Sequence, residues 1–101
     1  MPRQDAAASS EFQIFETEEF QKKLKKLPLR EFWFIQRKLT DYVYPQLRFD
    51  LFLGPNIKKL KGCQPATWRY RIGRFRLFFL VDNEDHIVAM LSIDDRRNAY
   101  R

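Results

Sequence analysis

The sequence predicts an α+β domain of two layers, in which an N-terminal strand, an αα-hairpin and an antiparallel β-meander follow one another. Residues 17–43 repeat their apolar side chains at helical spacing, whereas residues 68–93 mostly alternate them at strand spacing. The chain has 101 residues, enough for one compact domain. We therefore expect residues 11–101 to form a single domain and residues 1–10, which show no periodicity, to form a flexible extension.

The first expected elements are a short strand and a helix. Residues 11–15 (EFQIF) alternate Phe12 and Ile14 as a strand does, and Thr17 is a suitable helix N-cap because its side-chain oxygen can accept a hydrogen bond from a free backbone amide. The apolar face of this helix is Phe20, Leu24 and Leu27, and the other face is Lys22, Lys23, Lys25 and Lys26. Such a lysine face is typical of a helix surface in water, and contact with RNA is the alternative.

A second helix is expected over residues 29–43, after Pro28. Its predicted buried stripe is Phe32, Ile35, Leu39 and either Tyr42 or Val43. We expect Pro45 to stop this helix, because proline lacks the backbone N–H that the helix interior uses. Residues 45–56 show no clear pattern, and residues 56–62 (NIKKLKG) form a short basic segment anchored by Ile57 and Leu60.

Residues 68–82 (WRYRIGRFRLFFLVD) predict a β-hairpin. The apolar positions are even before Gly73 and odd after it, which a two-residue loop at Gly73 and Arg74 explains. Glycine at the first loop position suits a type II′ turn, which needs a positive φ there. The resulting cross-strand pairs are Ile72 with Phe75, Arg71 with Arg76, Tyr70 with Leu77, and Arg69 with Phe78.

A third strand is expected over residues 86–93, with Ile87, Ala89, Leu91 and Ile93 on one face. If Val81 pairs with Ile87, this set continues the apolar face of the hairpin. On the opposite face, which we call the open face, Ser92 would then lie beside Arg76 and Asp94 beside Arg74.

The open face carries the main functional signal. It places Arg71 across from Arg76, with Arg69 two residues along, and like charges across strands cost a few tenths to about 1 kcal/mol. An anion lying across the strands would relieve that repulsion, and the planar guanidinium fork suits phosphate. The sequence therefore predicts a phosphate-binding face, and a face that is merely solvated is the alternative.

Composition restricts the remaining possibilities. The net charge of +6 favours an acidic partner, either nucleic acid or an acidic protein. Cys63 is the only cysteine, so an intrachain disulfide and a cysteine-based zinc site are excluded. The longest apolar run, residues 77–81, is far shorter than the roughly 20 residues of a membrane span, and residues 1–10 do not have the apolar pattern of a signal segment. We expect a cytoplasmic protein.

Neither a cofactor nor a metal is expected. His86 stands alone at a turn, and the three glycines are too scattered for a phosphate loop. Any chemistry would therefore rely on arginine, lysine, tyrosine and serine side chains, which stabilise negative charge well. Arginine stays protonated at relevant pH and is a poor base, so the acceptor of a 2′-hydroxyl proton is not assigned.

The order of these motifs resembles the RelE/ParE superfamily of bacterial and archaeal toxins. The resemblance covers about residues 12–101 and rests on LKG before the hairpin, GRFRLFF in its second strand, and RRNAYR at the C-terminus. It implies the toxin of a type II toxin–antitoxin system, a metal-independent endoribonuclease that cleaves mRNA on the ribosome through 2′-hydroxyl attack. The implied partners are a cognate antitoxin, mRNA and the ribosome, without a cofactor.

The resemblance also implies site residues. The catalytic positions would be Arg69, Arg71, Arg76, Arg96 (or Arg97) and Tyr100, and further RNA-binding positions would be Lys58, Lys59, Lys61, Arg74, Arg97 and Arg101. Arginines stand here at strand positions where well-studied RelE enzymes have lysines, and the terminal segment is shorter. The alternatives are a ParE-like inhibitor of DNA gyrase and a non-catalytic module that only binds an antitoxin.

Overall fold

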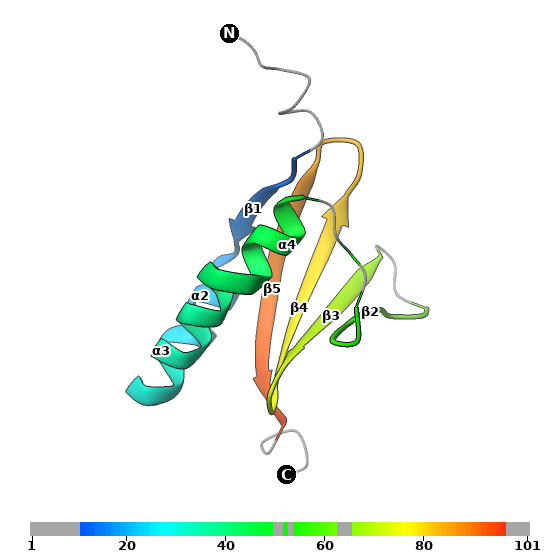
Figure 1. Ribbon diagram of the computed structural model, residues 1–101. Helices are drawn as coiled ribbons and strands as arrows, with labels where there is room; N and C mark the ends of the chain where they lie inside the picture. Colours follow the sequence, from blue (N-terminus) through cyan, green and yellow to red (C-terminus); the bar gives the residue numbers. More distant parts are fainter. Residues whose placement is uncertain (1–10, 50–51, 53, 63–65, 97–101) are drawn as a thin grey trace, which may run out of the picture.

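A five-stranded mixed sheet forms the centre of the computed structural model, which describes residues 11–49, 52, 54–62 and 66–96 (Figure 1). In chain order the strands are β1 (Gln13–Glu16), β2 (Ile57–Lys59), β3 (Thr67–Ile72), β4 (Phe75–Asp82) and β5 (Ile87–Asp95). Their order in the sheet is β1-β5-β4-β3-β2, with β1 parallel to β5 and the other pairs antiparallel. The predicted α+β class and the N-terminal strand, helical hairpin and meander are confirmed.

Some of the predicted features lie outside the described residues. They are the flexible extension at residues 1–10, Cys63, and the C-terminal Arg97, Tyr100 and Arg101.

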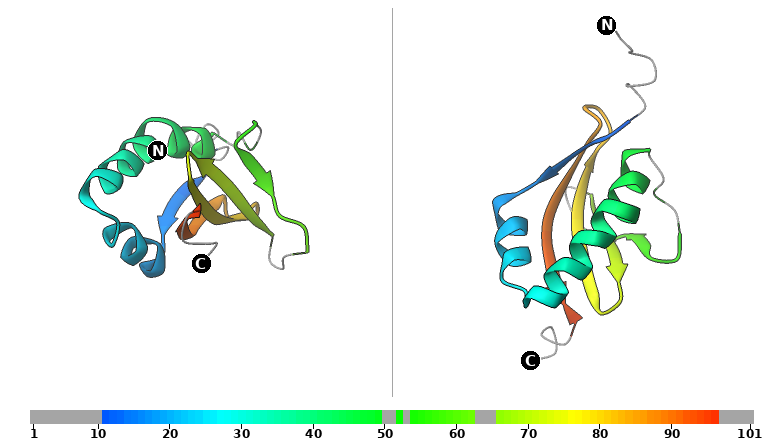
Figure 2. Two further views of the ribbon diagram at one scale, coloured as in Figure 1. Left: turned by 90° about the horizontal axis from the view of Figure 1, so that it is seen from below. Right: turned by 60° about the vertical axis from the view of Figure 1, so that its left-hand side comes forward.

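The helices pack on one face and one edge of this sheet. They are α2 (Glu18–Lys25), α3 (Leu29–Lys38), a π-helical turn η1 (Leu39–Val43) and α4 (Tyr44–Arg48). Figure 2 shows α3 and α4 crossing one face, while α2 lies beside the part of β5 that β1 leaves uncovered. The opposite face, the open face, has no helix over it in the described part of the chain.

Thr17 begins α2 as its N-cap, as predicted. Its Oγ1 accepts a hydrogen bond from the backbone N–H of Phe20 at 3.2 Å and donates one to the carbonyl of Met90 at 2.7 Å. One side chain therefore caps the helix and attaches it to β5.

None of the described helices is long and apolar enough to cross a membrane.

The prediction that Pro45 stops the second helix is wrong. The helical chain continues to Arg48, because η1 precedes the proline and changes the hydrogen-bond spacing, with the Tyr44 N–H donating to the Leu39 carbonyl. Pro45 then occupies the first turn of α4, where its missing N–H costs little. Val43 rather than Tyr42 takes the buried position of the stripe.

The hydrophobic core lies between the helices and the sheet. The apolar face of the hairpin supplies Phe75, Leu77 and Phe79, which are at most 2% exposed. Burial of each such side chain stabilises the fold by about 1.5–3 kcal/mol. The remaining fully buried side chains are Phe20, Ile35, Leu39, Val43, Leu47, Val88 and Met90.

The predicted third strand, β5, is present, but its predicted register against β4 is wrong. A bulge between Phe78 and Phe79 makes Phe78 pair with Ser92 and Phe79 with Met90, so Leu91 is the extra residue. Because one extra residue moves the following side chains to the other face, Val88 and Met90 enter the core instead of Ile87 and Ala89.

The bulge also changes the neighbours of the arginines. Val81 pairs with Val88 rather than with Ile87. On the open face Asp94 lies opposite Arg76, and Ser92 lies opposite Phe78; Asp94 does not pair with Arg74 and Ser92 does not pair with Arg76.

The basic segment at residues 56–62 contains a strand that was not predicted. Strand β2 pairs with β3, which places Ile57 opposite Tyr70 and Lys58 opposite Arg69. Ile57 is buried, whereas Lys58 and Lys59 are exposed at the edge of the sheet.

Candidate functional site

The hairpin of β3 and β4 positions the candidate site as predicted. Arg71 pairs with Arg76 and Arg69 with Phe78, and the loop consists of Gly73 and Arg74. Gly73 has a φ of 57°, and no positive φ is found at Arg74. A positive φ at the first loop position alone is the signature of the type II′ turn, which keeps the two arginine-bearing strands in register.

The open face brings together four cationic side chains from three adjacent strands. Arg69 and Arg71 come from β3, Arg76 from β4, and Lys58 from β2, where it lies opposite Arg69. All four alternate with the core residues of their strands, so they share the face away from the helices. The predicted convergence of Arg69, Arg71 and Arg76 is therefore present in the structure.

Two of these guanidinium groups have donors without acceptors. The Nε atoms of Arg69 and Arg76 are buried and lack a hydrogen-bond partner within the described part of the chain. A buried donor left unpaired costs about 1–3 kcal/mol, and more when the group is charged. An anion bound across the cationic side chains of this face would offset the repulsion between Arg71 and Arg76, which supports the anion-binding interpretation of this face.

Arg74, which was predicted to bind RNA, does not lie with the other cations on the open face. Its Nη2 donates to Glu31 at 2.6 Å, and its Nε contacts both carboxylate oxygens of Asp95 at 3.0 Å. The hydrogen bonds to Glu31 and then to Asp95 raise the pKa of Arg74 further above its ordinary value. Its guanidinium therefore ties the hairpin loop to α3 and to the end of β5, and two carboxylates already occupy its donors.

The predicted lysines separate into different positions. Lys58 faces the open side, whereas Lys59 pairs with Trp68, whose row belongs to the core side of the sheet. Lys61 lies exposed in the turn after β2. Only Lys58 is therefore placed in line with the arginines.

Lys23 was not predicted to be part of the site. Its Nζ donates to Ser92 Oγ at 2.9 Å and lies 3.5 Å from Asp94 Oδ1, so it reaches two open-face side chains of β5. It also contacts Glu19 one turn earlier at 3.4 Å. A run of four lysines gives no indication of which one meets a strand about 70 residues later, and only the position of α2 beside β5 selects Lys23.

Asp94 was also not predicted as a site residue. It lies opposite Arg76 on the open face and is 44% exposed at its side chain. The sequence pattern gives no sign of the bulge in β5, so Asp94 was expected opposite Arg74 and not opposite Arg76.

The C-terminal part of the predicted site is described only at Arg96. Its backbone N–H donates to the carbonyl of Arg74 at 2.7 Å, which keeps the chain beside the hairpin loop as it leaves β5. The predicted contributions of Arg97, Tyr100 and Arg101 fall outside the described residues.

His86 packs against Phe12 and stabilises the local fold. Its φ is 55°, and its ring stacks on Phe12 with the ring centroids 4.8 Å apart, which secures the turn before β5 against the start of β1. In residues 11–49, 52, 54–62 and 66–96, no group of three His, Cys, Asp or Glu side chains is placed to hold a metal ion.

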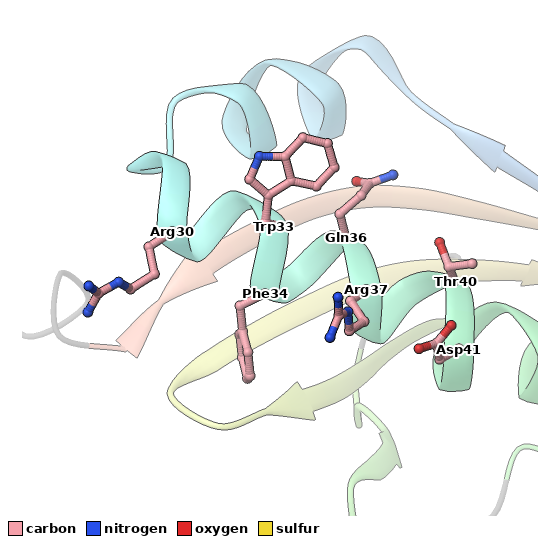
Figure 3. A pocket seen from close by; sticks show the side chains of 7 residues that line it. All are labelled: Arg30, Trp33, Phe34, Gln36, Arg37, Thr40 and Asp41. Atoms are coloured by element: carbon pink, nitrogen blue, oxygen red, sulfur yellow. The ribbon is translucent and has the colours of Figure 1, made fainter.

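A second surface of mixed character lies on the outer side of α3. Arg30, Trp33, Phe34 and Arg37 are among the residues that line a pocket of about 570 Å³. Figure 3 shows their side chains projecting from α3. Trp33 is 60% exposed and Phe34 43% exposed. This surface carries apolar and cationic groups but lies on the helical side of the molecule, separate from the open face.

The chain resembles RelE proteins in both sequence and structure. It is 35% identical over 83 residues to RelE1 of Methanocaldococcus jannaschii, a protein named as a toxin, covering 79% of this chain and 84% of that protein. No family model matches the chain.

Solved structures show the same fold. The toxin–antitoxin complex RelBE2 of Mycobacterium tuberculosis superposes with a TM-score of 0.67 at 22% identity, covering 85% of this chain and 99% of that one. The RelB–RelE complex of Methanococcus jannaschii gives 0.64 at 22% identity, with coverages of 85% and 94%. A variant of Escherichia coli RelE in the free state gives 0.62 at 18% identity, with coverages of 89% and 88%.

Proposed function

Because this chain belongs to the RelE toxin family, we propose that it is the toxin of a type II toxin–antitoxin system and an endoribonuclease that cleaves mRNA on the ribosome. In the proposed reaction the 2′-hydroxyl of one nucleotide attacks the adjacent phosphate. The transition state carries more negative charge on the phosphate oxygens than the substrate does. Groups already fixed to receive that charge are often the largest single contribution to catalysis.

The open-face arginines are the observation that carries this proposal. Arg69, Arg71 and Arg76 share one face of β3 and β4, and Arg71 lies directly opposite Arg76. An RNA phosphate would offset the repulsion between these arginines, and a guanidinium fork can bind two phosphate oxygens at once. Lys58, on the neighbouring strand, would extend the contact along the RNA backbone.

Exposed apolar side chains and the net charge support a protein partner, which we propose to be a cognate antitoxin. Trp33 and Phe34 line one pocket on α3 and are 60% and 43% exposed. Clustered apolar groups of this kind mark interaction surfaces. The net charge of +6 favours an acidic partner. Three of the similar solved structures are RelB–RelE or RelBE complexes, and action on the ribosome would place the protein in the cytoplasm.

The test is cleavage of mRNA in a reconstituted translation system by the wild type and by Arg76→Ala. Removal of one donor to a transition-state oxyanion typically costs about 10²–10³ in rate, so we expect Arg76→Ala to lose at least 100-fold. Arg30→Ala is the matched control, because it removes the same charge from an exposed position of α3. Thermal unfolding checks that both variants remain folded.

Two outcomes would reject the proposal. Full cleavage by Arg76→Ala would exclude the open face as the site of chemistry. Absence of cleavage by the wild type, combined with inhibition of purified gyrase in a supercoiling assay, would favour the ParE-like alternative.

A further inference from the structure

We propose that Asp94 is the general base of this cleavage, taking the proton from the attacking 2′-hydroxyl, and that Lys23 positions its carboxylate. This inference rests on the proposed nuclease function and adds the group that the arginine face lacks. Guanidinium groups have donors only, so they can bind the phosphate but cannot accept a proton. A carboxylate is the opposite kind of group, since it accepts hydrogen bonds and protons.

The strand register places Asp94 beside the phosphate-binding groups. Asp94 on β5 lies opposite Arg76 on β4, and Arg76 lies opposite Arg71 on β3, so the three side chains form one row across the open face. Side chains directly opposite each other in an antiparallel pair have Cβ atoms about 4.5–5.5 Å apart. A 2′-hydroxyl and the phosphate that it attacks belong to the same nucleotide linkage, so adjacent residues can contact both.

Asp94 is not neutralised by the arginine that it faces. No ion pair joins Arg76 and Asp94 within the described residues; the carboxylate contacts Lys23 instead, and Arg76 Nε has no partner. The side chain of Asp94 is also 44% exposed, so a substrate can reach it. A carboxylate and a guanidinium with no ion pair between them thus stand side by side, each able to bind a different part of the RNA.

Lys23 holds Asp94 from the other side. Its Nζ bonds to Ser92 Oγ, contacts Glu19 on its own helix and lies 3.5 Å from Asp94. These contacts fix the lysine against β5 and give the carboxylate a defined neighbour. Lys23 therefore acts on the reaction through Asp94, which makes it a positioning residue.

Asp95, the adjacent carboxylate, does not fit the same role. It pairs with Phe75 on the core side, its side chain is 9% exposed, and it is bound to Arg74. The open face therefore selects Asp94 from the two neighbouring aspartates.

The proposed step is balanced as follows. The 2′-oxygen forms a bond to phosphorus while its proton passes to the Asp94 carboxylate. The bond between phosphorus and the 5′-oxygen breaks, with its electron pair leaving on that oxygen, which takes a proton from water. The products are a 2′,3′-cyclic phosphate and a 5′-hydroxyl, and the hydroxide formed from water removes the proton from Asp94.

The first experiment compares mRNA cleavage by the wild type, Asp94→Asn and Asp94→Glu in the reconstituted translation system. Loss of a general base typically costs about 10²–10⁴ in rate, so we expect at least a 100-fold loss for Asp94→Asn and partial retention for Asp94→Glu. Asp85→Asn is the matched control, because Asp85 lies exposed in the turn before β5. Lys23→Gln, which keeps the carboxylate, should lose less than Asp94→Asn.

A second experiment separates catalysis from a structural role through pH. Asp94→His puts a group with an ordinary pKa of about 6.5 at this position, so its cleavage rate should rise between about pH 6 and 8. The rate is divided by the wild-type rate at the same pH, because the activity of the ribosome also depends on pH and affects both proteins equally. A residue that only supports the fold would not create such a dependence.

A third experiment distinguishes a base from an acid. A substrate with sulfur in place of the bridging 5′-oxygen has a leaving group that needs no protonation. It should therefore not restore cleavage by Asp94→Asn, because that variant lacks the group that takes the 2′ proton.

The results distinguish the two proposals. If the wild type does not cleave RNA, the proposed function fails. If the wild type cleaves and Asp94→Asn cleaves equally fast, or if the sulfur substrate restores its rate, only the assignment of Asp94 is overturned.

Discussion

The ion pairs of Arg74 predict a large loss of stability in Arg74→Ala. Arg74 bonds to Glu31 at 2.6 Å and to Asp95 at 3.0 Å, and these carboxylates are 23% and 9% exposed. Water therefore replaces the lost guanidinium poorly, above all at Asp95. The variant should keep the fold but separate the hairpin loop from α3.

The expected magnitude follows from this intermediate burial. An exposed ion pair contributes about 0–1 kcal/mol, whereas removal of one partner from a buried pair costs about 3–5 kcal/mol. The Arg74 cluster lies between these limits, so we expect the free energy of unfolding to fall by more than the loss of an exposed pair would cause. For a domain of this size, each kcal/mol of lost stability lowers the melting temperature by about 4–8 °C.

Thermal and urea unfolding of purified protein measure this loss. Arg74→Lys keeps the charge but replaces the planar fork with a point donor, so it should recover only part of the loss. A double-mutant cycle with Glu31→Gln should give a coupling free energy clearly different from zero. A melting temperature within about 2 °C of wild type, or equal to that of Arg30→Ala, would refute the reasoning.

Two further predictions concern stability. Burial, followed by the hydrogen bond to Glu16, raises the pKa of Tyr44, so the unfolded chain loses this proton at lower pH than the native protein does. Above about pH 10 the free energy of unfolding should therefore fall with pH more steeply for the wild type than for Tyr44→Phe, by up to about 1.4 kcal/mol per pH unit. Urea unfolding at several pH values measures both free energies, and equal slopes for the two proteins would contradict this prediction. Thr17→Ala removes the cap of α2 and the hydrogen bond to Met90, so the free energy of unfolding should fall by about 1–2 kcal/mol. Thr17→Ser keeps the hydroxyl and should retain most of this stability. Equal unfolding midpoints for these two variants would show that the hydroxyl does not stabilise the helix.

Local sequence patterns were sufficient for the parts of the fold that depend on near neighbours. The Thr17 cap and the hairpin loop at Gly73 each involve a few consecutive residues, and the parity of the hairpin then sets the pairing of Arg71 with Arg76. For the same reason the row of open-face arginines can be predicted from the sequence alone. Their binding of RNA stays a prediction.

Features that depend on distant contacts could not be predicted in the same way. The bulge in β5 reverses the faces of Val88 and Met90, although Ile87 and Ala89 fit the alternating pattern equally well. The helix past Pro45 depends on a π-helical turn that no propensity signals.

The same limit applied to the candidate site. Arg74 looked like another open-face cation, but Glu31, which bonds to it, lies 43 residues away in sequence. Lys23 meets Ser92 across a separation of 69 residues. The positions of the charged residues in the sequence thus identified the cationic strands. Which partner each charged side chain contacts could be found only from the folded structure.

The pairing of β1 with β5 has a consequence for how the chain folds during synthesis. Residues 13–16 are made first but bond to residues 87–90, and Thr17 reaches Met90 across 73 residues. Until β5 has been synthesised, β1 has no strand partner and β4 has one unpaired edge. Such distant pairings form slowly, and unpaired edges associate with other chains. A chain that terminates before β5 should therefore aggregate or be degraded.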